Sequence, residues 1–127
     1  MSDKTVVEKL LLKAGQTLLL VNAPDGYEGT IGRLPAGAAV LRQPAGAPDV
    51  IQVFAKSKAD LLASLPPLKG LAKPNGIIWI TYPKGGAKAG TDVNRDIIWA
   101  LVREMGLDLV ANFSVDSVWS ALRAKVL

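Results

Sequence analysis

The chain of 127 residues contains neither cysteine nor histidine. It therefore has no thiolate nucleophile and no imidazole proton shuttle, and it lacks the ligands on which zinc, haem and iron–sulfur sites depend. Ser-His catalytic arrangements are excluded for the same reason. Carboxylate, lysine, tyrosine and hydroxyl chemistry remains, so the composition favours non-catalytic functions and predicts no metal site.

Long apolar segments are also missing, although half of the residues are hydrophobic. Runs such as Leu18–Val21 and Ile77–Ile80 are far shorter than the roughly 20 residues of a membrane-spanning helix. The N-terminus, Met1-Ser2-Asp3-Lys4, does not have the pattern of a signal peptide. We therefore expect a cytoplasmic protein that has no membrane as a partner.

Charge is not concentrated anywhere in the chain. The formal net charge is +4, and the 15 lysines and arginines are scattered without a run longer than Lys56-Ser57-Lys58. Proteins that bind nucleic acids usually carry such residues as a clustered stripe. The sequence therefore favours a small anionic molecule or a protein as the partner over nucleic acid.

Short apolar runs predict the strands of a parallel sheet. Thr17–Ala23, Val50–Ala55 and Ile77–Thr81 are nearly continuous in apolar residues, which is typical of strands that are buried on both faces. Turn-forming residues and helical patterns separate these runs. The sequence predicts one α/β domain over residues 1–127, with an open and mostly parallel sheet.

Two longer helices are predicted between the strands. One spans Ser57–Leu65, with Ser57 as its N-cap, and we expect Pro66 and Pro67 to interrupt it. The other spans Asp92–Met105, where apolar residues recur every four positions, and we expect Thr91 or Asp92 as its N-cap.

Two further segments lie at the edges of the predicted sheet. Leu109–Asp116 and Val118–Val126 alternate in side-chain type, so we expect an antiparallel hairpin at one edge, with a turn at Asp116-Ser117. Ala38–Gln43 is a further candidate strand. Only Pro44–Pro48 follows it, which is short for a parallel crossover, so a parallel, an antiparallel and an irregular arrangement all stay open.

In this order the elements resemble a shortened class I S-adenosylmethionine-dependent methyltransferase fold. Leu12–Val21 is similar to the lead-in and first strand of that fold, and Leu68–Ile80 is similar to a later helix, turn and strand. A closing antiparallel hairpin is also typical of it. The resemblance implies a truncated Rossmann-like sheet, and ligands of open α/β sheets bind at the carboxyl ends of the strands.

The chain departs from that family where the cofactor would bind. The family has spaced glycines after its first strand, but here the loop is Asn22–Gly26, in which Pro24 supplies no N–H. The family ends its second strand in an acid that binds ribose hydroxyls, but Ala38–Gln43 ends in Arg42 and Gln43. S-adenosylmethionine is therefore the cofactor that the resemblance implies, yet we expect none to be bound.

A second resemblance covers nearly the whole chain. Four blocks are similar to those of a bacterial family of small proteins of unknown function: Asn22–Tyr27, Trp79–Lys84, Thr91–Asp96 and Ser114–Arg123. That family implies no activity that could be carried over.

The carboxyl edge of the predicted sheet is where we expect a ligand. Six residues on the loops of this edge are the candidates: Asp25, Tyr27, Lys56, Tyr82, Lys84 and Asp116. The lysines and the glycine-containing loop after Tyr82 suit an anion. The alternative is that the loop is a solvated connection and that the side chains near Asp25 only form a turn.

A separate surface is predicted on the second helix. Trp99 lies opposite the apolar stripe, between Arg95 and Arg103 one turn away on either side. Tryptophan and arginine are enriched at protein interfaces, so these three residues are a candidate partner or homodimer surface. The alternative is that the C-terminal hairpin or the N-terminal segment covers Trp99.

We therefore expect a non-catalytic, methyltransferase-like domain that binds a small anionic molecule or a protein. One alternative is an S-adenosylmethionine-dependent methyltransferase-type enzyme in which Asp25, Asp116 or Tyr82 provides polar groups of the site. The other alternative is a structural homodimer module.

Overall fold

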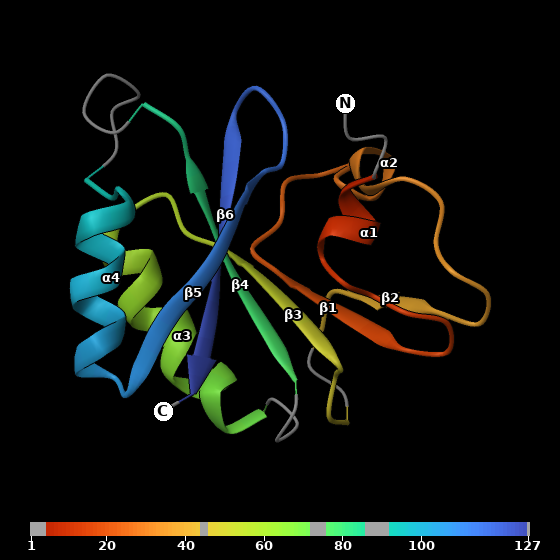
Figure 1. The fold of residues 1–127 in the computed structure, drawn as a ribbon, viewed down its shortest axis with the longest axis horizontal. Coiled ribbons are helices and arrows are strands. Elements are labelled where there is room, and N and C mark those ends of the chain that lie inside the picture. The colour runs from red at the N-terminus through yellow and green to blue at the C-terminus, as the bar shows by residue number, and fades with distance from the viewer. Residues whose placement is uncertain (1–4, 44–45, 72–75, 86–91, 127) are drawn as a thin grey trace.

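The computed structural model describes residues 5–43, 46–71, 76–85 and 92–126. One sheet of six strands, in the order β2-β1-β3-β4-β6-β5, has helices on both faces (Figure 1). The strands are β1 (Thr17–Val21), β2 (Ala39–Leu41), β3 (Val50–Phe54), β4 (Ile77–Pro83), β5 (Leu107–Ser114) and β6 (Trp119–Val126). The helices are α1 (Val6–Lys9), α2 (Glu28–Ile31), α3 (Lys58–Leu71) and α4 (Arg95–Glu104).

β1, β3 and β4 are parallel, as the apolar runs predict. Leu19 of β1 lies opposite Ile51 of β3, which lies opposite Ile78 of β4, and all three side chains are buried. β6 is antiparallel to β4, and β5 is antiparallel to β6. The predicted fold class, a mostly parallel α/β sheet with an antiparallel hairpin at one edge, is confirmed.

The direction of the strand near residue 40 is now defined. β2 is parallel to β1, with Val40 opposite Leu18. Because β2 is only three residues long, the chain travels a short way back before β3 begins at Val50. A short connection is therefore sufficient for this parallel crossover. Asp49, the last residue before β3, is bonded to the start of β1, because one of its carboxylate oxygens accepts from the Thr17 amide at 2.9 Å.

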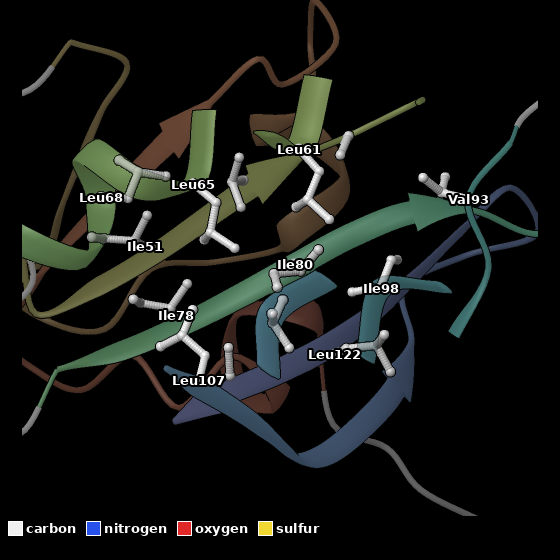
Figure 2. Packing of buried hydrophobic residues seen from close by; sticks show 14 of the residues in the cluster. Ile51, Leu61, Leu65, Leu68, Ile78, Ile80, Val93, Ile98, Leu107 and Leu122 are labelled. Carbon is white, nitrogen blue, oxygen red and sulfur yellow. The ribbon is translucent and has the colours of Figure 1, made fainter. Parts of the chain in front are cut away.

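Two apolar clusters lie on the two faces of the sheet. Figure 2 shows the first, in which leucines of α3 and residues of α4 gather over β3, β4 and β6. The second joins α1 and α2 to the opposite face and includes Phe54, Trp79 and Trp119. None of the described helices has the length and the apolar composition of a membrane-spanning segment.

The predicted break at Pro66 and Pro67 is wrong, because α3 continues through both prolines to Leu71. Each proline removes one N–H donor from the helix. The carbonyls that lose their partners belong to Leu62 and Ala63, which are exposed and can bond water. On the other side of α3, buried Leu61, Leu65 and Leu68 hold the helix against the sheet.

The start of α4 also differs from the prediction. The N-cap is Asn94, whose side-chain oxygen accepts from the Ile97 amide at 2.9 Å. Asp92 instead accepts from the Lys58 amide at 2.8 Å, so it satisfies a donor in the first turn of α3. Asp92 and Asp96 therefore do not share one helix. Thr91 lies outside the described residues.

Strict alternation is interrupted in β5. Leu109 pairs with Ala124 and Ala111 pairs with Arg123, so Val110 is an extra, bulged residue. The bulge changes the face on which later residues lie. Leu109 packs on the α3–α4 cluster, whereas Phe113 meets the ring of Trp79 on the opposite face at 4.9 Å. Unbroken alternation over Leu109–Asp116 would place Leu109 and Phe113 on one face, so that part of the prediction is wrong.

Candidate functional site

The carboxyl ends of β1, β2, β3 and β4 meet at one edge because these strands are parallel. At this edge Asn22 follows β1 with a φ of 58°, a left-handed conformation that turns the chain away from the strand. Its side-chain amide donates to Ser64 Oγ of α3 at 3.0 Å. The loop after β1 therefore begins with a fixed turn, which positions the residues up to Tyr27.

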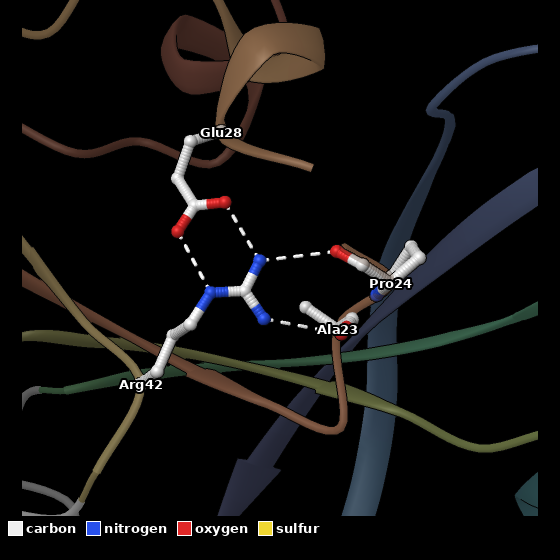
Figure 3. A network of polar contacts seen from close by, with 4 residues as sticks. All are labelled: Ala23, Pro24, Glu28 and Arg42. Carbon is white, nitrogen blue, oxygen red and sulfur yellow. Dashed lines mark hydrogen bonds and ion pairs between the residues drawn. The ribbon is translucent and has the colours of Figure 1, made fainter. Parts of the chain in front are cut away.

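Arg42 binds this loop to the end of β2 (Figure 3). Its Nε donates to Glu28 Oε2 at 2.7 Å and its Nη2 donates to Glu28 Oε1 at 2.6 Å. The same guanidinium donates to the carbonyls of Ala23 at 3.2 Å and Pro24 at 3.0 Å. We call these four residues the Arg42 clasp. Bidentate pairing of arginine with a carboxylate fixes the orientation of both planar groups.

The clasp keeps Glu28 ionised to a lower pH than an ordinary glutamate. Hydrogen bonds from Arg42, followed by a backbone amide, lower the pKa of the Glu28 carboxyl to about 2. The bond to Glu28 in turn raises the pKa of Arg42. Because a carboxylate oxygen has more than one acceptor position, Glu28 can still accept from a ligand hydroxyl. Its side chain is 45% exposed, so a ligand can reach it.

A buried polar group lies behind this edge. The Gln52 side chain donates from Nε2 to Thr81 Oγ1 at 3.0 Å, and both residues are fully buried in neighbouring strands. Tyr27 is 3% exposed, and its ring meets Phe54 edge-on at 4.7 Å. Within the described part of the chain, the Tyr27 hydroxyl and Gln52 Oε1 have no hydrogen-bond partner in satisfactory geometry.

Burial controls the ionisation of Tyr27. Loss of solvent raises the pKa of its phenol to about 12, the Gln52 side chain lowers it in part, and the negative charge of Asp116 raises it. The phenol is therefore neutral at physiological pH. Tyr27 is therefore a core residue that packs beneath the carboxyl edge of the sheet and is shielded from solvent.

Three of the other predicted ligand residues lie at the ends of β1, β3 and β4, and the remaining two, Lys84 and Asp116, lie at the hairpin. On the β1 side, Asp25 is exposed and close enough to Arg42 to raise its pKa. At the end of β3, Lys56 is exposed, and its amide donates to Asp60. Tyr82 of β4 is half-buried and packs against the α3–α4 cluster.

The hairpin engages Lys84 and Asp116. Lys84 Nζ donates to Ser114 Oγ and, at 2.6 Å, to the Asp116 carbonyl. Asp116 Oδ1 accepts from the amides of Val118 and Trp119, both at 2.8 Å, and so forms the turn of the hairpin. These two predicted ligand residues therefore lie together and stabilise the end of β5 and the start of β6.

Sequence reasoning did not identify the pair at the centre of the clasp. Arg42 was noticed only because it stands where the methyltransferase family has an acid. Glu28 gave no signal, since it is separated from Arg42 by 14 residues and meets it only in the folded chain. Arg42 directly follows a strand, and a guanidinium at that position favours pairing with a carboxylate. A search of the neighbouring loops for an acid could therefore have indicated Glu28.

The predicted partner residues lie on α4. Trp99 is 49% exposed, and its Nε1 donates to Asp108 Oδ1 of β5 at 3.0 Å. Arg103 stacks over the Trp99 ring at 5.9 Å and pairs with Asp108 at 3.5 Å. Arg95 is exposed one turn earlier. The hairpin therefore contacts the indole through Asp108 but leaves half of it accessible.

Solved structures of S-adenosylmethionine-dependent methyltransferases have the same fold. One from Aquifex aeolicus aligns with a TM-score of 0.64 at 14% identity, covering 96% of this chain and 88% of that one. A TehB-like methyltransferase from Corynebacterium glutamicum aligns at 0.62 and 13% identity, covering 95% and 85%. A ribosomal protein L11 methylase from Lactobacillus delbrueckii subsp. bulgaricus aligns at 0.61 and 12% identity, covering 94% and 74%.

No protein-family model and no curated protein sequence matches this chain. The structural likeness shows a methyltransferase-like fold, because identities of this size are too low to carry function. The predicted methyltransferase-like fold is thus confirmed. The resemblance to a bacterial family of small proteins stays a prediction.

Proposed function

We propose that this chain binds a ligand of the S-adenosylmethionine class, a nucleoside with an amino-acid tail, at the carboxyl edge of β1 and β2. The observation that carries the proposal is the ionised Glu28 carboxylate, which the Arg42 clasp holds beside the end of β2. The resemblance noted in the sequence implies an acid at that strand end for the ribose hydroxyls. Here Arg42 replaces the acid and brings the carboxylate of Glu28 from α2 to the same edge.

The rest of the edge agrees with such a ligand in part. The left-handed turn at Asn22 provides the sharp exit from β1 that a close ligand requires. Pro24 offers no N–H, and its carbonyl is engaged by Arg42, so fewer backbone donors are available than in a glycine loop. At the end of β3, Lys56 has the charge that attracts the carboxylate of an amino-acid tail.

A purely anionic ligand suits this edge less well. Glu28 is ionised and Asp25 is exposed close to the same guanidinium, so an anion would meet two negative charges against the single positive charge of Arg42. Lys84, one of the cations expected to hold an anion, is engaged in the hairpin. The structural neighbours likewise favour the methyltransferase-type alternative. The proposal is one of binding and names no methyl acceptor.

Glu28→Gln is expected to weaken binding of S-adenosylhomocysteine about tenfold, because a neutral amide accepts hydroxyl hydrogen bonds less strongly than a carboxylate. Isothermal titration calorimetry of both proteins measures the change. Glutamine can accept only one of the two Arg42 hydrogen bonds, because its NH2 group is a donor, so we expect Arg42 to keep one bond to residue 28 and its two bonds to the carbonyls of Ala23 and Pro24. Glu104→Gln, which removes an exposed acid from α4, is the matched control and should bind as the unmodified protein does.

Two outcomes would contradict the proposal. A ligand that binds the folded state raises the melting temperature by mass action, so the absence of any shift at millimolar S-adenosylmethionine or S-adenosylhomocysteine rejects this ligand class. Binding that is equally tight in Glu28→Gln and in the unmodified protein would place the ligand away from the clasp.

A further inference from the structure

The sheet ends at β5, whose backbone is paired on one side only. β6 pairs with one edge of β5, and within the described part of the chain no strand pairs with the other edge. Such an edge carries free N–H and C=O groups that can pair with another strand. The opposite end of the sheet presents less of this surface, because β2 has only three residues.

The sequence of β5 does not protect this edge. Native proteins usually guard an open edge with lysine, proline or inward-pointing charges. Val110–Ser114 contains no charged residue and no proline, and the Val110 side chain is 50% exposed. The bulge at Val110 interrupts the edge and so hinders pairing with another strand in part, but the four residues after it pair regularly with β6.

The one charged residue of β5 is already engaged. Asp108 Oδ1 accepts from the Trp99 indole at 3.0 Å and from the Leu109 amide at 2.9 Å, and it pairs with Arg103. Asp108 therefore fixes α4 beside β5, and the rest of the strand has no charged residue of its own that would repel a second strand. The lysines next to it, Lys84 at Ser114 and Lys9 over the Phe113 ring, belong to other segments.

A hollow lies next to the edge, where α4 meets β5. It has a volume of about 440 Å³ and is lined by Arg95, Asp96, Trp99, Asp108 and Leu109. The half-exposed Trp99 indole supplies its aromatic surface. Arg95 and Asp96 bring opposite charges to neighbouring positions at the start of α4. The hollow thus combines an aromatic anchor with both signs of charge.

We propose that two copies of this chain associate through β5, with their β5 strands antiparallel about a two-fold axis. The edge groups of one β5 then pair with those of the other, and the two sheets become continuous. An axis perpendicular to the sheet places both α4 helices on the same face, on either side of the axis. Each hollow, with its Trp99, then faces the α4 helix of the other copy.

Self-association explains the composition of this surface better than an unrelated partner does. A two-fold contact requires that the same patch be complementary to itself. A surface of one charge would repel its own copy, whereas Arg95 beside Asp96 offers each copy a counter-charge. The uncharged Val110–Ser114 segment is likewise compatible with a second identical segment. This inference does not depend on the proposed ligand.

Val110→Lys is expected to convert a dimer into a monomer in sedimentation velocity, raising the dimer dissociation constant at least tenfold. Each copy contributes one lysine to the interface, and like charges close together on paired strands are destabilising. Leu62→Lys is the matched control, because Leu62 is an apolar residue of α3 that is 49% exposed, and it should remain dimeric.

Single cysteines test the register directly, since the chain has none of its own. Among Val110→Cys, Ala111→Cys and Asn112→Cys, at least one should form a disulfide-linked dimer on mild oxidation. Only residues near the axis bring two Cα atoms within the roughly 4.4–6.8 Å that a disulfide requires. Val118→Cys, which is 53% exposed in the hairpin turn, is the control and should not crosslink.

The proposal is overturned by either of two results. The first is a monomer at every concentration up to roughly 1 mM, at which even a dimer with a dissociation constant of about 1 mM would be detected. The second is a dimer that survives Val110→Lys and yields no crosslink at any of the three positions, which would place the interface elsewhere.

Discussion

Trp79→Ala is expected to lower the free energy of unfolding by about 3–5 kcal/mol, the usual cost of removing a large aromatic side chain from a core. Trp79 is 3% exposed in β4, near the middle of the sheet. Its ring meets Phe113 of β5 at 4.9 Å, and its Nε1 donates to the Leu10 carbonyl at 3.0 Å. One side chain therefore joins the sheet to the segment after α1. Urea denaturation followed by far-UV circular dichroism measures the loss.

Two variants make this result interpretable. Trp99→Ala removes the same side chain from a site that is 49% exposed, and it should cost less than about 1.5 kcal/mol in the monomer. Trp79→Phe retains most of the ring packing but leaves the buried Leu10 carbonyl without its donor, so we expect a loss of about 1–3 kcal/mol. Because domains of this kind have about 5–15 kcal/mol in total, Trp79→Phe remains measurable if Trp79→Ala unfolds. A loss below about 1 kcal/mol for Trp79→Ala would contradict the central role of this side chain.

The sheet could be predicted because its signals are local. Strands buried on both faces need continuous apolar runs, and Leu18–Val21, Val50–Phe54 and Ile77–Ile80 provide them at separations that suit helical crossovers. The hairpin was equally visible, because Asp116 in a short polar turn separates two alternating segments. These patterns depend on neighbours in the sequence, so they could be recognised without coordinates.

The errors arose where tertiary packing prevails over a local rule. A proline pair normally ends a helix, but three buried leucines hold α3 against the sheet while the affected carbonyls face solvent. Alternation in β5 predicts one apolar face, yet the bulge at Val110 allows Leu109 to reach α4 and Phe113 to reach Trp79. Both compensations depend on what the element packs against, so neither can be predicted from the residues of the element alone.

The candidate site was predictable in its position but not in its chemistry. The carboxyl edge follows from strand direction, and Asp25 does lie there, close to Arg42. Glu28, the acid on which the proposed site depends, comes from α2 and is brought to this edge by its contact with Arg42, so the sequence alone gives no sign of it. Lys84 has the residue type of an anion ligand, but its neighbours in the hairpin use its donors.

Alkaline unfolding should depend on Tyr27. Burial raises the pKa of the Tyr27 phenol to about 12, whereas the unfolded chain has an ordinary value near 10. The folded state therefore favours the neutral phenol. The resulting stability is fully present below pH 10 and is lost as the pH rises from 10 through 12. The loss at pH 12 is on the order of 2 kcal/mol, and the free energy of unfolding measured in urea at several pH values records it.

Tyr27→Phe separates this loss from the deprotonation of lysines in the same pH range. Phenylalanine keeps the edge-on contact with Phe54 but has nothing to ionise, so the variant should lose on the order of 2 kcal/mol less between pH 9 and pH 12. At neutral pH it should be as stable as the unmodified protein or slightly more so, because the hydroxyl it removes is buried and, in the described part of the chain, has no hydrogen bond of satisfactory geometry. Tyr82→Phe leaves Tyr27 in place and should keep the full alkaline loss. Equal alkaline losses in Tyr27→Phe and the unmodified protein would mean that the Tyr27 hydroxyl reaches water in the folded state. The burial of Tyr27 beneath the carboxyl edge of the sheet would then be wrong.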